Sequence, residues 1–345
     1  MNNYLGLLIG GGDCPGLNAV IRAIVRRALI AHVSVLGIHS GWQGLIEGDI
    51  EPLTRYSVAG LQHRGGTILG TSRCNPFDSP ERLRKIKDHW RKYGLDSLIV
   101  VGGNGTLSAA MRMWRDEGLQ LVGIPKTIDN DIPGTDYSFG FDTAVSIATE
   151  AIDRLHTTAE AHHRVMVVEV MGRHTGWIAT YAGIAGGGDI ILVPEIPFRI
   201  SALCDLLAAR KEMGRPFSIV VVAEDARPHP DEDFVTPAQK ERIYREEHLG
   251  GIGELVGRQI EKLTQLPARV TVLGYIQRGG TPSAYDRILA TRLGVHAVEM
   301  VLRREFGYMA ALSGTKMASV PLEEIADKIK PVDDEIYRTA EVFFG

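Results

Sequence analysis

The stretch VVGGNGTLSAA, Val100 to Ala110, indicates how this chain folds. An apolar run over 98–101 ends at two glycines, and Asn104, Gly105 and Thr106 then lead into residues that favour a helix. A strand that passes through glycines into a helix exposes backbone N–H groups, and such turns commonly bind phosphate. Thr106 suits a helix cap as well as it suits a phosphate oxygen. The stretch therefore predicts a strand, a tight turn and a helix, with a candidate anion site at the turn.

Other apolar runs resemble this strand, at 4–9, 33–39, 120–125, 164–170, 189–195, 217–224 and 268–276. Segments between them, such as 17–31 and 143–163, carry apolar residues at the three- and four-residue spacing of a helix. Continuous apolar strands that alternate with helices predict mainly parallel sheets covered on both faces. With 345 residues, we expect an α/β protein of two domains.

The composition excludes several classes of protein. Apolar residues make up 44%, charged residues 23%, and the net charge is −4, so we expect a soluble protein with no nucleic-acid or membrane partner. The opening residues 1–13 are too short and glycine-rich for a signal peptide. The three cysteines lie far apart, without the spacing of a metal site or an even number for disulfides. A cytoplasmic location is therefore expected.

A second glycine loop follows the first predicted strand. Ligands of open α/β sheets bind at the carboxyl ends of strands, so GGGDCPGLNAVIR, 10–22, is a candidate phosphate loop. It does not match G-x-G-x-x-G, and a plain strand–helix turn explains it equally well.

A third loop, PKTIDNDIPGTD at 125–136, places Asp129 and Asp131 two residues apart after Lys126 and Thr127. One carboxylate can take a proton from a hydroxyl while the other binds a metal or a sugar. The same sequence is also typical of a turn closed by Asx hydrogen bonds.

Several arginines add positive charge near strand ends. Arg173 follows a predicted strand in MGRHTGWIA, and Arg278 stands beside two glycines in LGYIQRGGTPSAYDR. The guanidinium fork matches phosphate oxygens, and Arg73, Arg164 and Arg269 could join them. Glycine loops, a candidate base and several arginines together indicate phosphoryl transfer to a phosphorylated substrate.

These motifs resemble those of the 6-phosphofructokinase family. They are GGDCPGLNAVIR, GGNGT, PKTIDND, EAIDRL, VVEVMGRHTGWIA, LVPE and LGYIQRGGTPSAYDR, and they run from residue 10 to about 295. The chain is similar to the phosphofructokinase A type, and within it to a bacterial mixed-substrate group that combines glycine and lysine at the phosphoryl-donor site.

The resemblance implies an architecture and an assembly. It implies two Rossmann-like three-layer domains with the active site in the cleft between them. The ATP-binding domain would take residues 1–140 and 256–305, and the fructose 6-phosphate-binding domain 141–255 and 306–345. It also implies a cytoplasmic homotetramer whose active sites are shared between subunits.

The implied reaction is glycolytic: the γ-phosphoryl group of Mg·ATP passes to the C1 hydroxyl of fructose 6-phosphate. Asp129 matches the family's catalytic base, with Thr127 beside it, and Arg173 matches the residue that stabilises the transferring group. Mg²⁺ would lie near Asn104 and Asp131. Implied ATP-binding residues are Gly11, Arg73, Cys74, Gly103, Asn104, Gly105 and Thr106. Implied substrate-binding residues are Lys126, Thr127, Asp129, Asp131, Met171, Gly172, Arg173, Glu224, Tyr275 and Arg278, with Arg164 and Arg269 lent by the neighbouring subunit.

Two residues depart from the family pattern. Tyr275 stands where some members have a histidine against the sugar, and a phenol can also form hydrogen bonds. Asn104 stands where many members have an aspartate near Mg²⁺. An amide oxygen can still be a ligand but adds no charge, so Asp131 becomes the main carboxylate near the metal.

The resemblance gives opposing indications of the phosphoryl donor. Pyrophosphate-using relatives typically carry aspartate at the position of Gly105, whereas glycine leaves room for ATP. Lys126 favours pyrophosphate, because many ATP enzymes have glycine there. A flexible lysine can swing aside or pair with a phosphate of either donor, so steric room predicts ATP, with pyrophosphate as the alternative.

Some bacterial members also bind an effector between subunits. Arg22, Arg26, Arg154 and Arg215 fall at or near basic positions of that site, and Asp189 falls near its acidic position. Arg22 and Arg26 lie one helical turn apart, so a solvated helix face is a nearly equal alternative.

Other classes of function fit the sequence less well. A dehydrogenase would rest on the first glycine loop alone and leave TIDND unexplained. A sugar-phosphate sensor without catalysis is the stronger rival, and Asn104 is its main support. Sedoheptulose 7-phosphate stays open as an acceptor.

Overall fold

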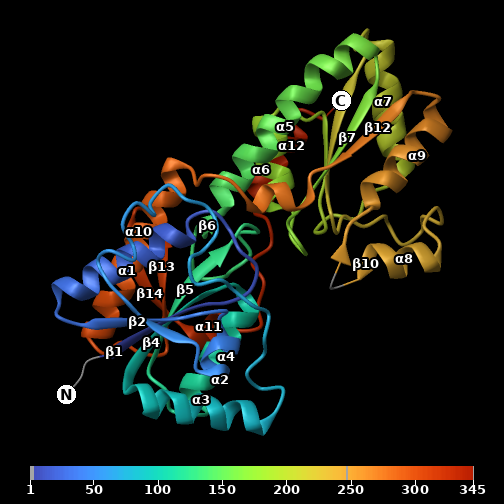
Figure 1. Ribbon diagram of the computed structural model, residues 1–345. Helices are drawn as coiled ribbons and strands as arrows, with labels where there is room; N and C mark the ends of the chain where they lie inside the picture. Colours follow the sequence, from blue (N-terminus) through green and yellow to red (C-terminus); the bar gives the residue numbers. More distant parts are fainter. Residues whose placement is uncertain (1–3, 246–247, 345) are drawn as a thin grey trace. The chain divides into compact units, whose positions relative to one another are not determined.

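The computed structural model describes residues 4–245 and 248–344, and these form two compact units. The first unit takes the chain up to Thr143 together with Arg278–Ile329, and the second takes Ala144–Gln277 together with the segment from Lys330 onward. Each unit has its own sheet and its own helical layers (Figure 1). The two-domain α/β fold expected from the sequence is confirmed.

The sheet of the first unit has the strand order β14-β13-β5-β4-β1-β2-β3. Its strands are β1 (Tyr4–Ile9), β2 (Ser34–Ile38), β3 (Ile50–Leu53), β4 (Leu95–Gly102), β5 (Leu121–Thr127), β13 (Tyr308–Ser313) and β14 (Lys316–Pro321), and short β6 (Phe139–Gly140) also pairs with β5. The pairs from β13 to β2 are parallel, and only the outer strands β14 and β3 are antiparallel. The central strands are buried on both sides, which explains their continuous apolar sequences.

Helices cover both faces of this sheet (Figure 1). On one face α1 (Leu17–Ile30) packs along α10 (Ala284–Leu302). On the other lie α2 (Trp42–Glu47), α3 (Pro80–Tyr93), α4 (Asn104–Arg115) and α11 (Leu322–Ile325). The core on this second face joins apolar residues of the strands, such as Leu8 and Leu98, to Leu45, Ile86 and Leu107 of the helices.

The order of the strands creates a switch point between β1 and β4. The chain leaves β1 through α1 and enters β2 on one side, whereas it leaves β4 through α4 and enters β5 on the other. Ligands of such sheets bind outside the carboxyl ends of the strands at this point. The two glycine loops of the sequence, after β1 and after β4, lie here.

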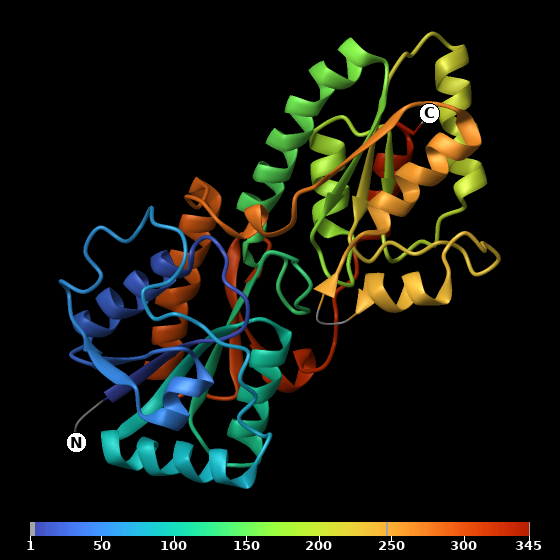
Figure 2. The ribbon, with the colours of Figure 1, turned by 45° about the vertical axis from the view of Figure 1, so that its right-hand side comes forward.

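The sheet of the second unit is entirely parallel, with the order β12-β7-β9-β8 (Figure 2). Its strands are β7 (Val165–Val170), β8 (Ile190–Leu192), β9 (Ser218–Ala223) and β12 (Ala268–Val272), and a two-stranded ribbon joins β10 (Tyr244–Arg245) to β11 (His248–Leu249). Its helices are α5 (Phe141–His162), which begins in the first unit, α6 (Trp177–Ala185), α7 (Ile200–Glu212), α8 (Pro237–Ile243), α9 (Ile252–Thr264) and α12 (Asp334–Glu341); a 3₁₀ turn, η1, spans Gly274–Arg278.

The units differ from the expected domain boundaries mainly in two segments, apart from 141–143, which fall in the first unit. Residues 256–277 belong to the second unit, because α9 packs on β7 and β12 pairs with β7. Residues 306–329 belong to the first unit, because β13 pairs with β5 and β14 with β13. In the described residues, no helix is long and apolar enough to cross a membrane.

Candidate active site

The first turn of α4 packs tightly against the loop after β1. A Cβ atom on Gly10 would lie 2.6 Å from Thr106 Cγ2, and one on Gly102 would lie 2.4 Å from the same atom. The backbone N–H of Gly10 also donates to the carbonyl of Val101, at 2.9 Å. The N-cap of α4 is Gly103, so the buried Thr106 side chain fills this contact and does not cap the helix.

Neither packing nor the backbone conformation requires a glycine at position 105. It is the second residue of α4 and is exposed, and a Cβ atom there would meet no atom of the described residues within 4 Å. Its φ is not positive, so its backbone suits any residue. The space beside it is open at a helix N-terminus, where backbone N–H groups and the helix dipole favour an anion.

A segment before α3 lies beside the loop after β1. The N–H of Gly11 donates to the carbonyl of Ser72 at 2.9 Å, and the Thr71 hydroxyl donates to the carbonyl of Gly11 at 2.6 Å. These bonds hold Arg73 and Cys74 next to the glycine loop in the first unit. Arg73 is exposed, and Cys74 is partly buried against the core.

Two cations contact the same loop. The ammonium of Lys126 donates to the carbonyl of Gly12, and the guanidinium of Arg278 donates from Nη1 to the carbonyl of Asp13 at 3.2 Å. Lys126 is only 3% exposed, and its burial lowers the pKa of the ammonium. From the sequence alone, this lysine is expected to be able to swing aside. In the structure it is packed at the end of β5, because its ammonium has a partner on the neighbouring loop.

The TIDND segment folds into a turn and also buries its carboxylates. The N–H of Asp129 donates to Thr127 Oγ1 at 3.0 Å, and Thr127 Oγ1 donates to Asp129 Oδ2 at 3.2 Å. Asn130 has a φ of 51° and accepts from the N–H of Ser138 at 3.0 Å. This bond links positions 130 and 138, farther apart than the two residues that a local Asx turn spans. Asp129 and Asp131 are 3% and 7% exposed, and a turn alone gives no reason to bury two carboxylates.

Asp131 and Asn104 are in direct contact. Asn104 Nδ2 donates to Asp131 Oδ2 at 2.9 Å, which joins the start of α4 to the loop after β5. Their oxygens are the hard ligands that Mg²⁺ prefers. In the described part of the chain, no group of three or more His, Cys, Asp or Glu residues could hold a metal. A Mg²⁺ ion held by this pair would take its other ligands from water and from a phosphate.

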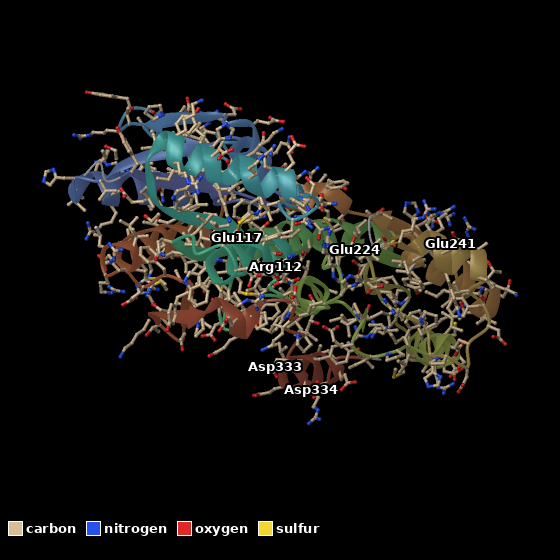
Figure 3. All side chains as sticks on the ribbon, turned by 90° about the horizontal axis from the view of Figure 1, so that it is seen from below. Arg112, Glu117, Glu224, Glu241, Asp333 and Asp334 are labelled. Atoms are coloured by element: carbon tan, nitrogen blue, oxygen red, sulfur yellow. The ribbon has the colours of Figure 1, made fainter. Side chains whose placement is uncertain are left out.

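In the second unit, a loop after β7 is tied to the end of β9. Glu224 Oε1 accepts from the N–H of Arg173 at 2.9 Å and from the N–H of Gly172 at 3.3 Å. Arg173 adopts a φ of 50°, which is uncommon for a residue with a side chain. Met171 and Arg173 are half-buried, and Glu224 is buried and labelled in Figure 3.

Arg164 and Arg269 lie at the other end of the same sheet. Arg164 precedes β7, whereas Arg173 follows it, so one strand of six residues, about 20 Å, separates them. Arg269 is near the start of neighbouring β12, pairs in register with Met166, and contacts Glu261 at 3.1 Å. Tyr275 lies in η1 after β12 and is 71% exposed.

Three of the candidate effector residues, Arg22, Arg154 and Asp189, have ordinary partners. In the first unit, Arg22 donates to Gln62 Oε1 at 3.2 Å, and Arg26 is exposed. In the second, exposed Arg154 pairs with Glu150 at 2.5 Å, and Arg215 is exposed. Asp189 pairs with Arg210 at 2.6 Å and accepts from the N–H of Ile219 at 2.8 Å. Sequence reasoning missed the Asp189–Arg210 pair.

Sequence reasoning also missed His174, Asp225 and Arg227. His174 Nδ1 lies 2.8 Å from Asp225 Oδ2, and Arg227 donates to both oxygens of Asp225. Since His174 and Asp225 are 51 positions apart, no local pattern in the sequence could have paired them.

Known proteins are similar to this chain in sequence. Residues 4–301 match the family model for phosphofructokinase. The chain is 52% identical over 342 residues to a pyrophosphate–fructose 6-phosphate 1-phosphotransferase of Streptomyces coelicolor, and the match covers 99% of both chains. It is 49% identical over 338 residues to ATP-dependent 6-phosphofructokinase 3 of the same organism, covering 98% of both.

Solved structures are also similar. The phosphofructokinase of Pichia pastoris in the T-state has a TM-score of 0.81 and 33% identity; the match covers 94% of this chain and 35% of that one, so this chain spans about a third of the yeast protein. A pyrophosphate-dependent phosphofructokinase of Nitrosospira multiformis has a TM-score of 0.85, with 100% and 93% coverage; its 20% identity supports the fold alone. The chain belongs to the phosphofructokinase family.

Proposed function

We propose that the protein is an ATP-dependent 6-phosphofructokinase. It transfers the γ-phosphoryl group of ATP to the C1 hydroxyl of fructose 6-phosphate and forms fructose 1,6-bisphosphate, as a cytoplasmic enzyme of glycolysis. The observation that carries the choice of ATP is the open space beside Gly105.

Gly105 favours ATP for a steric and an electrostatic reason. An exposed glycine in a helix costs about 1 kcal/mol relative to alanine, and here neither packing nor a positive φ requires it. The missing side chain leaves room at the N-terminus of α4 for the α-phosphate and nucleoside of ATP. A carboxylate in this place would crowd and repel that phosphate.

Pyrophosphate is the second candidate donor, and buried Lys126 favours it. A cation fixed on the carbonyl of Gly12 suits a compact and highly charged ligand. Sequence identity does not separate the donors, since relatives named for pyrophosphate are 50–52% identical and those named for ATP are 47–49% identical.

The first unit binds the phosphoryl donor and supplies the base in this proposal. Gly11, Gly103, Gly105 and the N–H groups of α4 bind phosphate, and Arg73, Cys74 and Thr106 complete the ATP site. Asp129, buried and beside the Thr127 hydroxyl, takes the proton from the C1 hydroxyl. Lys126 stabilises negative charge near the phosphates.

Asn104 and Asp131 would hold Mg²⁺ together with phosphate oxygens of ATP. The ion would neutralise charge that develops on the transferring group. Asn104 keeps the Asp131 carboxylate in a fixed orientation through its amide N–H.

The second unit binds the sugar phosphate and contributes Arg173. Met171, Gly172 and Glu224 contact the sugar, Tyr275 forms a hydrogen bond to it, and Arg173 stabilises the transferring phosphoryl group. Arg278, which belongs to the first unit, binds the 6-phosphate of its own subunit. Arg164 and Arg269 bind the 6-phosphate of a neighbouring subunit within a homotetramer. The strand length between Arg164 and Arg173 supports this sharing.

A regulatory site between subunits is a further part of the proposal, and its candidate residues are Arg22, Arg26, Arg154, Asp189 and Arg215. The bond of Asp189 to Arg210 gives this carboxylate a structural role as well.

A panel of phosphoryl donors tests the proposal. The purified protein receives Mg²⁺, fructose 6-phosphate and either ATP or pyrophosphate, and kcat/KM is measured for each. A higher value with ATP supports the proposal, and a higher value with pyrophosphate replaces ATP by the second candidate. Sugar-phosphate binding without turnover on either donor would instead indicate a sensor.

A further inference from the structure

The loop that carries Arg173 has a backbone that must be held in place by its surroundings. Gly172 to Thr175 form a tight turn, closed by the N–H of Thr175, which donates to the carbonyl of Gly172 at 3.1 Å. Arg173 is the first of the two central residues and has a φ of 50°. Turns with a positive φ at this position normally use glycine, asparagine or aspartate. An arginine here is strained, and such strain is retained at functional sites when neighbouring contacts fix it.

One fixing contact lies on the N-terminal side of the turn, where Glu224 accepts from the N–H groups of Gly172 and Arg173. A second contact involves a side chain of the turn itself. His174, directly after Arg173, places Nδ1 2.8 Å from Oδ2 of Asp225. Glu224 and Asp225 are consecutive, so the end of β9 holds both the backbone and a side chain of the turn.

Asp225 is well suited to orient the histidine ring. The residue is 1% exposed, and Arg227 donates to its two oxygens at 3.1 Å each. A buried carboxylate held by a guanidinium has little freedom to move. Since an ionised carboxylate can only accept, the ring nitrogen that faces it carries the proton.

We propose that His174 is a positioning residue that, through its Nδ1–H bond to Asp225, holds the turn in the conformation from which Arg173 acts. The inference rests on the proposed function, because it takes Arg173 as the residue that stabilises the transferring phosphoryl group. His174 itself need not touch either substrate.

The pair of variants His174→Asn and His174→Leu separates the hydrogen bond from the bulk of the side chain. The amide N–H₂ of asparagine can occupy nearly the position of Nδ1 and donate to Asp225, whereas leucine has a similar shape and no donor. The side chain of His174 is 34% exposed, so both variants should fold. If leucine prevents folding, His174→Ala, which also lacks a donor, takes its place.

Steady-state kinetics and hydrogen exchange are measured on the full chain. We expect His174→Leu to lower kcat by about 10- to 100-fold, the range for a misplaced catalytic group, with KM for fructose 6-phosphate nearly unchanged. His174→Asn should retain most of kcat. Without substrate, peptides covering 171–176 should exchange faster in His174→Leu than in wild type, and His174→Asn should resemble wild type.

The inference is overturned if His174→Leu matches wild type in kcat and exchange, or if His174→Asn is as impaired as His174→Leu. The exchange measurement needs no turnover, so it tests the Asp225 bond even if the wild-type protein uses another phosphoryl donor or none. Failure of the proposed function is seen separately, as a wild type inactive with ATP.

Discussion

Asn104, the first residue of α4, donates its side-chain amide to Asp131 at 2.9 Å. An aspartate in place of Asn104 would put two carboxylates in contact, and these repel unless a cation lies between them. The amide thus lets the site keep its shape without a metal. Because the amide is uncharged, it adds no negative charge for binding a metal ion.

We expect Asn104→Asp to strengthen the binding of a divalent cation by about tenfold in the absence of any phosphoryl donor, because affinity follows the charge of the ligands. Titration with Mn²⁺, followed by electron paramagnetic resonance, measures this. Asn104→Leu, with similar shape and no polar group, serves as the control and should bind Mn²⁺ more weakly than wild type. Equal Mn²⁺ affinity in all three proteins would contradict the proposed metal site.

Asp129→Asn should lower kcat by about 10²-fold or more, the range of general base catalysis. The amide preserves the shape and the bond to Thr127 but cannot take a proton from the C1 hydroxyl. The affinity for fructose 6-phosphate, measured by calorimetry, should change little. Near-normal turnover by this variant would remove Asp129 as the base.

Gly105→Asp should raise KM for ATP strongly while the affinity for fructose 6-phosphate stays the same. The new side chain extends into space that is empty of protein atoms, so the melting temperature should hold, and only a ligand can be displaced. Gly105→Asn is the uncharged match and should impair ATP less, because it adds bulk without charge. If Gly105→Asp leaves kinetics with ATP unchanged, ATP does not use this space.

Arg164 and Arg269 should act on the active site of a neighbouring subunit. Mixing inactive Arg164→Ala subunits with inactive Asp129→Asn subunits should restore activity, because some hybrid sites then combine an intact arginine with an intact base. Each variant mixed with itself is the control. Native mass spectrometry establishes that hybrids form, and dead hybrids would refute the sharing.

Asp286 should make the protein less stable as the pH rises from about 4 to about 6. It is fully buried on α10, and burial raises the pKa of its carboxyl from 3.8 to about 6, despite bonds from Thr143 that act in the opposite direction. Between these values the native state binds more protons than the unfolded state, so deprotonation costs stability, by about 3 kcal/mol.

Asp286→Asn keeps an oxygen for Thr143 and removes the titration. Urea unfolding at pH 4, 5, 6 and 7 should show a smaller loss of stability with pH in this variant than in wild type. Glu169 and Asp189 also have raised pKa values because they are buried, but they contribute equally to both proteins. Parallel pH profiles for the two proteins would show that Asp286 does not titrate in this range.

Much of the fold could be predicted from the sequence, because a strand that is buried on both faces of the sheet has a continuous apolar run. The apolar runs at 4–9, 97–101 and 217–224 are the central strands β1, β4 and β9, and the glycines after β1 and β4 lie at the switch point. The strands β13 and β14 were not predicted. Their positions depend on pairing with β5, which is distant in the sequence, and the same pairing moves 306–329 into the first unit.

For the site, the sequence determined which residue types stand after which strands, since a loop's composition is local. Only the tertiary structure decided what each side chain contacts. From the sequence, Lys126 is expected to be a flexible cation. In the structure it is buried, and its bond to the carbonyl of Gly12 fixes it. From the sequence, Asn104 appears only as the loss of a carboxylate near the metal. In the structure its amide donates to Asp131. The bond between His174 and Asp225 joins the ends of β7 and β9. Such contacts depend on which strands are neighbours. The packing of the whole core determines the order of the strands, and the residues in contact do not.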